Sequence, residues 1–175
     1  GYAGRLESGI LRVGDEVIVL PSGFSSKVKT IDQMGKSLKE AFAPMSISVQ
    51  LEDDIDISRG DMIVRKKNQP EKTQEFDAML CWLGNDAFQD RTKFLIRHTT
   101  NEQTAMIKEV TYKVDVNTLD RTPDDKSMGM NDICRVKIKT AAPIMMDEYR
   151  DNRSTGSFIL INPNTNETVA AGMII

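Results

Sequence analysis

Three residues in the first half of the chain, Gly35-Lys36-Ser37, have the types that a phosphate-binding loop uses for its lysine and hydroxyl. They follow a stretch with strand alternation and precede a stretch that could form one helical turn, as such a loop would. The loop also needs an earlier glycine that lets backbone N–H groups wrap the phosphates, and Thr30 occupies that position. We therefore predict an ordinary turn here and assign no cofactor-binding residue.

A run of carboxylates is the stretch with the best metal-ligand chemistry, because calcium prefers several carboxylate oxygens on one tight loop. The run comprises Glu52, Asp53, Asp54 and Asp56. It lacks the central glycine and the distant glutamate of a calcium loop. We predict a hydrated turn and assign no metal ligand.

His98 is the single histidine, so Ser/His/Asp or Cys/His catalysis would have to use it. No candidate nucleophile lies in the strained strand-to-helix turn that such chemistry uses. We predict a structural or surface histidine and assign no catalytic residue. Cys81 and Cys134 lie far apart and lack C-x-x-C spacing, which favours two core thiols over a disulfide or a zinc site.

The stretch Asp147–Gly156 combines arginines, an aromatic residue and amides between two expected strands. Loops of this composition commonly form binding surfaces, although a long hydrated connection would have the same composition. We predict that the loop contributes an interface. Its candidate contact residues are Tyr149, Arg150, Asn152, Arg153 and Thr155.

The composition describes an ordinary globular chain rather than a disordered or membrane-spanning one. Of its 175 residues, 39% are hydrophobic and 28% are charged, and no apolar run reaches membrane-spanning length. The formal net charge of −3 argues against a nucleic-acid groove, which needs a concentrated basic face. No signal segment opens the chain, so we expect a cytoplasmic location.

The elements that must position these residues are short strands. Glu16–Leu20 follows a Gly14-Asp15 turn, and a similar Gly60-Asp61 turn precedes another apolar run, which suggests related strands of one sheet. Further alternation predicts strands at 27–31, 45–51, 93–97, 104–116, 133–142, 157–161 and 168–175. The stretch 75–83 is apolar on both faces toward its end, which predicts a central strand. The pattern predicts an all-β fold of two antiparallel barrels.

The sequence also predicts a linker between the barrels, one possible helical turn and a proline that marks a strand end or an edge. The charged, proline-broken stretch 66–72 predicts a linker between a barrel at residues 1–68 and a barrel at residues 74–175. Leu38–Phe42 could form one helical turn, and Pro143 predicts the end of a strand or an edge strand.

Several motifs resemble the second and third domains of elongation factor Tu-like GTPases, and nearly the whole chain takes part. Gly4–Val17 resembles the start of the second domain. Leu51–Asp61, Asn131-Asp132-Ile133, Asn152–Ile161 and Thr168–Ile174 are more particular and resemble the large, GTP-binding subunit of bacterial sulfate adenylyltransferase. The resemblance implies that Gly1 lies inside the first barrel, which would then lack its N-terminal strand and leave an unpaired edge.

That family combines a P-loop GTPase domain with two barrels and works with a small catalytic subunit. The resemblance implies a role in forming adenosine 5′-phosphosulfate from ATP and sulfate, with GTP and magnesium bound by the parent protein. Some members also carry an adenylylsulfate kinase after the second barrel. The expected partners are therefore the GTPase domain of the same chain, the small subunit and, in fused forms, the kinase.

The GTPase motifs themselves are absent from these 175 residues, so the resemblance assigns no catalytic residue and no bound cofactor here. It implies instead a docking and coupling role for the barrels. Two alternatives stay open, namely translation-factor barrels that hold tRNA or the ribosome, and a scaffold without an enzyme. Salt-dependent RNA binding would favour the translation factor.

Overall fold

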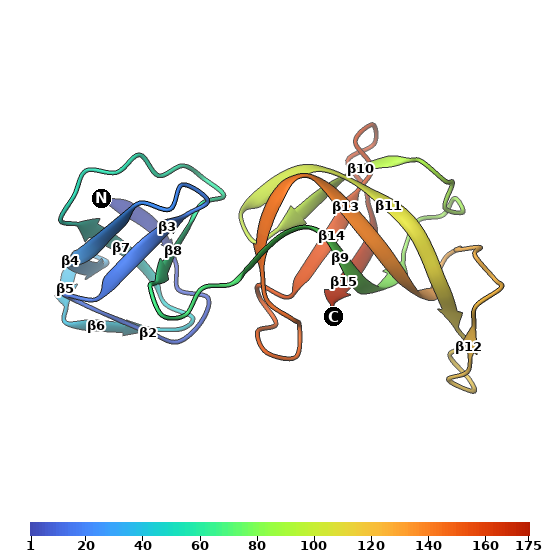
Figure 1. Ribbon diagram of the computed structural model, residues 1–175, viewed down its shortest axis with the longest axis horizontal. Helices are drawn as coiled ribbons and strands as arrows, with labels where there is room; N and C mark the ends of the chain where they lie inside the picture. The colour runs from blue at the N-terminus through green and yellow to red at the C-terminus, as the bar shows by residue number, and fades with distance from the viewer. The chain divides into compact units, whose positions relative to one another are not determined.

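The computed structural model describes all residues from Gly1 to Ile175 and contains fifteen β-strands and no α-helix (Figure 1). The predicted all-β class is therefore confirmed. No helix is present that could cross a membrane. The chain divides into two compact units, Gly1–Pro70 and Glu71–Ile175.

The first unit is a six-stranded antiparallel sheet with a separate two-stranded ribbon. The sheet order is β1-β7-β4-β3-β8, with β5 beside β4, and β2 pairs with β6 to form the ribbon. Because no pairing joins β1 to β8, the ladder stays open between these two strands. The strands are β1 Tyr2–Arg5, β2 Ile10–Arg12, β3 Glu16–Leu20, β4 Ser25–Gln33, β5 Lys36–Leu38, β6 Glu40–Phe42, β7 Ser46–Leu51 and β8 Met62–Arg65.

Alternation in the sequence places one face of each strand of the first unit in a common core. Val17 and Val19 of β3 are fully buried, and Ala41 of the ribbon packs into the same cluster. The two strands that follow the Gly-Asp turns are direct neighbours, since Ile18 of β3 lies opposite Val64 of β8. The two Gly-Asp turns suggested that the strands after them belong to one sheet, and β3 and β8 do pair directly.

The predicted helical turn at Leu38–Phe42 is wrong. Leu38 ends β5, and Glu40–Phe42 forms β6, which pairs with β2. The preceding turn contains Gly35 at φ +78°, a conformation that glycine adopts without steric cost, and it closes the β4–β5 hairpin. Gly35-Lys36-Ser37 thus belongs to a hairpin and not to a strand-to-helix phosphate loop.

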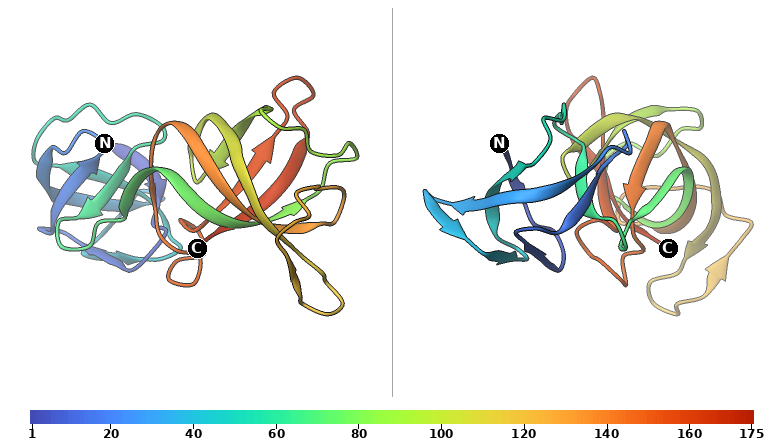
Figure 2. Two further views of the ribbon diagram at one scale, coloured as in Figure 1. Left: turned by 45° about the vertical axis from the view of Figure 1, so that its right-hand side comes forward. Right: turned by 60° about the vertical axis from the view of Figure 1, so that its left-hand side comes forward.

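The second unit is a closed antiparallel barrel. Its order is β10-β14-β15-β9-β13-β11, and a further pairing of β10 with β11 closes the ring, while β12 pairs with the far end of β11. Both views in Figure 2 show these strands wrapping around one interior. The strands are β9 Glu71–Trp82, β10 Lys93–His98, β11 Asn101–Val114, β12 Arg121–Thr122, β13 Ile133–Met146, β14 Ser157–Ile161 and β15 Thr168–Ile174.

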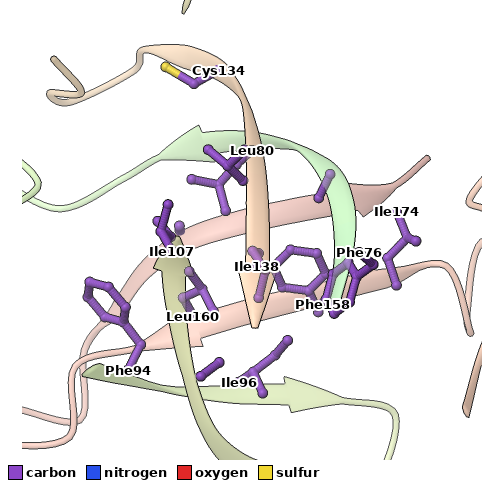
Figure 3. Packing of buried hydrophobic residues seen from close by; sticks show 14 of the residues in the cluster. Phe76, Leu80, Phe94, Ile96, Ile107, Cys134, Ile138, Phe158, Leu160 and Ile174 are labelled. Carbon is purple, nitrogen blue, oxygen red and sulfur yellow. The ribbon is translucent and has the colours of Figure 1, made fainter. Parts of the chain in front are cut away.

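Apolar side chains from all six strands of the ring fill the barrel interior (Figure 3). Leu80 and Ile138 are fully buried at its centre. The rings of Phe76 and Phe158 meet edge to face with their centroids 5.7 Å apart, a favoured aromatic geometry. Such a continuous core gives the outer face of the barrel a rigid base.

Pro143 does not end its strand. β13 continues to Met146 through an irregularity in its pairing with β9 between Lys139 and Ile144. Proline has no N–H for the ladder, and a bulge accommodates this loss. Beyond Thr140, β13 pairs with β9 alone, so this segment of the strand is an edge.

Candidate functional site

The loop between β13 and β14, residues 147–156, is folded by its own hydrogen bonds. The Asn152 side-chain oxygen accepts hydrogen bonds from the backbone N–H groups of Ser154 at 3.1 Å and Thr155 at 3.5 Å. The Asn152 backbone N–H donates to the carbonyl of Glu148 at 3.0 Å, and Gly156 N–H donates to the carbonyl of Asn152 at 2.8 Å. These bonds give a long loop one defined shape.

The same loop is tied to the barrel through His98, the last residue of β10. His98 Nε2 lies 2.6 Å from the Thr155 carbonyl oxygen, and because that oxygen can only accept, Nε2 carries the proton. The Thr155 hydroxyl donates to Asp147 at 2.5 Å, which joins the two ends of the loop. Of the two predicted alternatives, a structural or a surface histidine, the structure fits the first, since His98 is buried and bonded to backbone.

Burial lowers the pKa of His98, against the raising effects of the Thr155 carbonyl and the Asp147 carboxylate. The unfolded chain therefore takes up a proton at higher pH than the folded chain does. We expect the free energy of unfolding of the second unit to be fully maintained above pH 6.5 and to fall as the pH drops below it. Denaturant unfolding at pH 7.5 and 5.5 checks this, and His98→Gln should flatten the dependence in this range. An equal pH dependence in both proteins would contradict it.

The structure gives the five predicted contact residues different roles. Asn152 and Thr155 shape and anchor the loop, as their hydrogen bonds show. Tyr149 and Arg153 line a hollow on the barrel's outer face. Arg150 is exposed and pairs with Glu148 at 2.6 Å, outside the residues that line the hollow.

The hollow, which we call the groove, follows a row of cross-strand partners over five adjacent strands. Arg97 of β10 lies opposite Ile159 of β14, which lies opposite Ala171 of β15, then Cys81 of β9 and Ile133 of β13. Side chains directly opposite one another on antiparallel strands point to the same face. Four of these five side chains are apolar or a thiol, and they form the floor of the groove.

A second row widens the groove and brings it to the 147–156 loop. Ser157 lies opposite Met173, which lies opposite Met79. Tyr149 and Arg153 of the loop complete the lining, and the volume is about 710 Å³. Met173 is exposed to solvent and adds to the apolar surface of the groove.

The groove combines an apolar floor with two arginines at its margin. Arg97 is bonded to Glu102 at 2.7 Å on one side, and Arg153 stands on the loop. Sequence reasoning found the loop but missed the floor. A signal was present, because the last part of β9, Ala78–Trp82, is apolar on both faces, and its outward residues Met79 and Cys81 belong to the groove.

The remaining candidates have structural partners. Asp53 of the carboxylate run accepts a hydrogen bond from the Ser26 hydroxyl at 2.7 Å, and no group of three or more possible ligands converges anywhere in the chain. Cys134 is buried, which raises the pKa of its thiol to about 11, whereas Cys81 is half-buried on the groove floor. The prediction of two core thiols therefore holds for Cys134 only.

Comparison with known proteins gives close relatives over the whole chain. The chain is 49% identical over 175 residues to the bifunctional enzyme CysN/CysC of Mycobacterium tuberculosis, covering 99% of this chain and 28% of that protein. It is 43% identical to sulfate adenylyltransferase subunit 1 of Bacteroides thetaiotaomicron, covering 100% of this chain and 38% of that protein. The chain thus spans well under half the length of these relatives.

Comparison of structures supports the fold. The crystal structure of Sup35 complexed with GDP matches with a TM-score of 0.88 at 20% sequence identity, over 99% of this chain and 43% of that one. At this identity the likeness concerns the fold. A family model described as GTP-eEF1A C-terminal domain-like matches residues 75–175, the barrel that carries the groove. This chain therefore belongs to the GTP-eEF1A C-terminal domain-like family, and over nearly all of its own length it is similar to CysN/CysC and sulfate adenylyltransferase subunit 1 proteins.

Proposed function

We propose that this chain is the β-barrel portion of the GTPase subunit of a cytoplasmic sulfate adenylyltransferase. The parent enzyme would form adenosine 5′-phosphosulfate from ATP and sulfate and would use GTP hydrolysis, with magnesium, to drive the reaction. The observation that supports this proposal is the 39–49% identity, over essentially the entire chain, to relatives named bifunctional enzyme CysN/CysC or sulfate adenylyltransferase subunit 1. Residues 1–68 and 74–175 would correspond to the second and third domains of an elongation factor Tu-like protein.

Within that enzyme, the proposed task of the barrels is docking and coupling. A GTPase domain can influence a partner only if its two nucleotide states make different contacts with the rest of the protein. The groove offers a site for such contacts, because its floor is apolar and its base is a packed core. We assign Tyr149 and Arg153 to the contact, and the exposed Arg150 would extend it along the loop.

The occupant that we propose for the groove is the GTPase domain of the same parent protein, in one nucleotide state. Arginine and tyrosine beside an apolar floor are residues that commonly dominate protein interfaces. Binding of tRNA or the ribosome has less support, since the chain has a net charge of −3 and so is not basic overall. Salt-dependent RNA binding by the chain would favour that alternative.

Cys81 provides a direct test of docking, because its thiol lies on the groove floor. In the complete two-subunit enzyme, we expect alkylation of Cys81 by iodoacetamide to be about tenfold slower in one nucleotide state than in the isolated chain. The comparison would use GDP and a non-hydrolysable GTP analogue, with peptide mass spectrometry as the readout.

Cys134 is the internal control for this experiment. It is fully buried with a raised pKa of about 11, so it should stay unmodified in every state while the protein is folded. Modification of Cys134 would reveal unfolding rather than undocking. Equal rates at Cys81 in both nucleotide states and in the isolated chain would exclude nucleotide-dependent docking at the groove.

A further inference from the structure

His98 lies at the margin of the groove without being part of its surface. Its two neighbours in the chain, Arg97 and Thr99, both line the groove, whereas His98 is only 1% exposed. Successive side chains along a strand point to opposite faces, so the His98 ring points to the inner side of β10 while Arg97 points outward. His98 can therefore influence a docked partner only through the groups that its ring contacts.

The group that the ring contacts is the end of the 147–156 loop. His98 Nε2 donates to the Thr155 carbonyl oxygen at 2.6 Å, and the Asp147 N–H donates to the same oxygen at 3.3 Å. No other side chain of the barrel strands forms a hydrogen bond with the loop. The bond from His98 is thus the single side-chain attachment of the loop to the barrel.

The second attachment of the loop uses backbone atoms of β15. Tyr149 N–H donates to the Ile174 carbonyl at 2.9 Å, and Ile174 N–H donates to the Gly156 carbonyl at 2.8 Å. β14, into which the loop leads, lies between β10 and β15 in the sheet. The loop is therefore held on both sides of β14, and a side-chain substitution can remove the attachment to β10 alone.

Arg153 depends on the attachment to β10 more directly than Tyr149 does. It is exposed, it lines the groove, and it lies two residues before Thr155. The Asn152 side chain bonds the N–H groups of Ser154 and Thr155, which joins the backbone around Arg153 to the residue that His98 holds. A loop that is already ordered avoids the entropy cost of being ordered during binding.

We infer that His98 is a positioning residue for docking at the groove, because its hydrogen bond to Thr155 holds the backbone that carries Arg153. The inference rests on the proposed function, since it requires the GTPase domain to occupy the groove. Without this bond the attachment to β15 remains, but the Thr155 end of the loop must be ordered when the domain docks. We expect the docking equilibrium constant to fall about tenfold.

His98→Leu tests the inference in the complete two-subunit enzyme, because leucine keeps the site apolar and removes the donor. If docking slows alkylation of Cys81 about tenfold, a tenfold smaller docking constant reduces this protection to about twofold. The isolated chain with the same substitution supplies the reference rate. Hydrogen exchange at the amides of residues 154–156 should also become at least about tenfold faster, in the nucleotide state in which Cys81 reacts faster.

His98→Gln is the conservative variant. The amide nitrogen of glutamine can occupy nearly the position of the histidine Nε2 and can donate to the Thr155 carbonyl. We expect it to restore both the protection of Cys81 and the slow exchange of the loop amides.

Ile96→Val is the matched control for lost stability. Ile96 lies two residues before His98 on the same inner face of β10 and is fully buried. Removing one methyl group there leaves a small cavity and lowers the unfolding midpoint of the barrel without changing a contact of the loop. It should keep the wild-type protection of Cys81.

Full protection of Cys81 in a folded His98→Leu enzyme would overturn the positioning role and leave docking at the groove intact. Equal losses of protection in His98→Leu and Ile96→Val would overturn it, and so would a loss without faster exchange at residues 154–156. Absence of protection in the wild-type enzyme would overturn both proposals. If modification of Cys134 shows that His98→Leu unfolds the barrel, His98→Asn takes its place, because its shorter amide ends near the Nδ1 position, and the same outcomes apply.

Discussion

Replacing Gly156 with alanine is expected to lower the free energy of unfolding of the Glu71–Ile175 unit by about 3 kcal/mol. A Cβ at this position would lie 2.4 Å from Tyr149 Cα, 2.5 Å from Tyr149 N and 2.7 Å from the Asn152 carbonyl oxygen. These are backbone atoms, which cannot turn aside as a flexible side chain does. Gly156 itself is held by its hydrogen bonds to Asn152 and Ile174, both 2.8 Å long.

Guanidinium unfolding followed by the fluorescence of Trp82, the single tryptophan, measures this effect in the second unit alone. Gly129→Ala is the matched control, because a Cβ there would meet only an Asp132 side-chain oxygen, at an ordinary 3.7 Å. We expect that control to stay within about 0.5 kcal/mol of wild type. An unchanged midpoint for Gly156→Ala would contradict the close approach on which the loop shape depends.

The strands were predictable where one face of each is buried and the other is wet. Glu16–Leu20 was predicted with its observed bounds, and 27–31 was found as the middle of a longer strand, Ser25–Gln33. In both strands, apolar residues alternate with polar ones because one face is buried and the other faces water. Local sequence contains that information.

The errors arose where a partner distant in sequence decides the structure. Leu38–Phe42 has no local preference strong enough to resist pairing, and Glu40–Phe42 joins β2, about thirty residues earlier in the chain. Pro143 was expected to mark either the end of a strand or an edge, and the edge alternative is the observed one, because pairing of Ile144–Met146 with β9 alone continues the strand beyond it. Neither partner can be read from the residues themselves.

One part of the candidate site could be predicted from the sequence and the other could not. The 147–156 loop was recognisable because its arginines, tyrosine and amides are contiguous in the sequence. The groove floor was not, because Ile159, Ala171, Cys81 and Ile133 become neighbours only through the registers of four strands.

Ile159→Asp is expected to have the largest effect on function. Ile159 lies on the apolar groove floor, and docking would bury a new carboxylate there, which costs free energy because the charge is removed from water. We expect a loss of about 2 kcal/mol of docking free energy, equivalent to roughly 30-fold. The substitution lies outside the barrel core, so the Trp82 unfolding midpoint should change little.

Met106→Asp is the matched control for this variant. Met106 is a half-buried, outward-facing residue of β11 that does not line the groove. Its cross-strand partners are Lys93 and Lys139, which can accommodate a new carboxylate. It introduces the same charge into the same barrel and should leave coupling intact.

The ratio of adenosine 5′-phosphosulfate formation with and without GTP, measured in the complete two-subunit enzyme, tests the coupling role of the groove most directly. Our account predicts that Ile159→Asp reduces this ratio close to one, whereas Met106→Asp keeps the wild-type ratio. A wild-type ratio in a folded Ile159→Asp enzyme would contradict it.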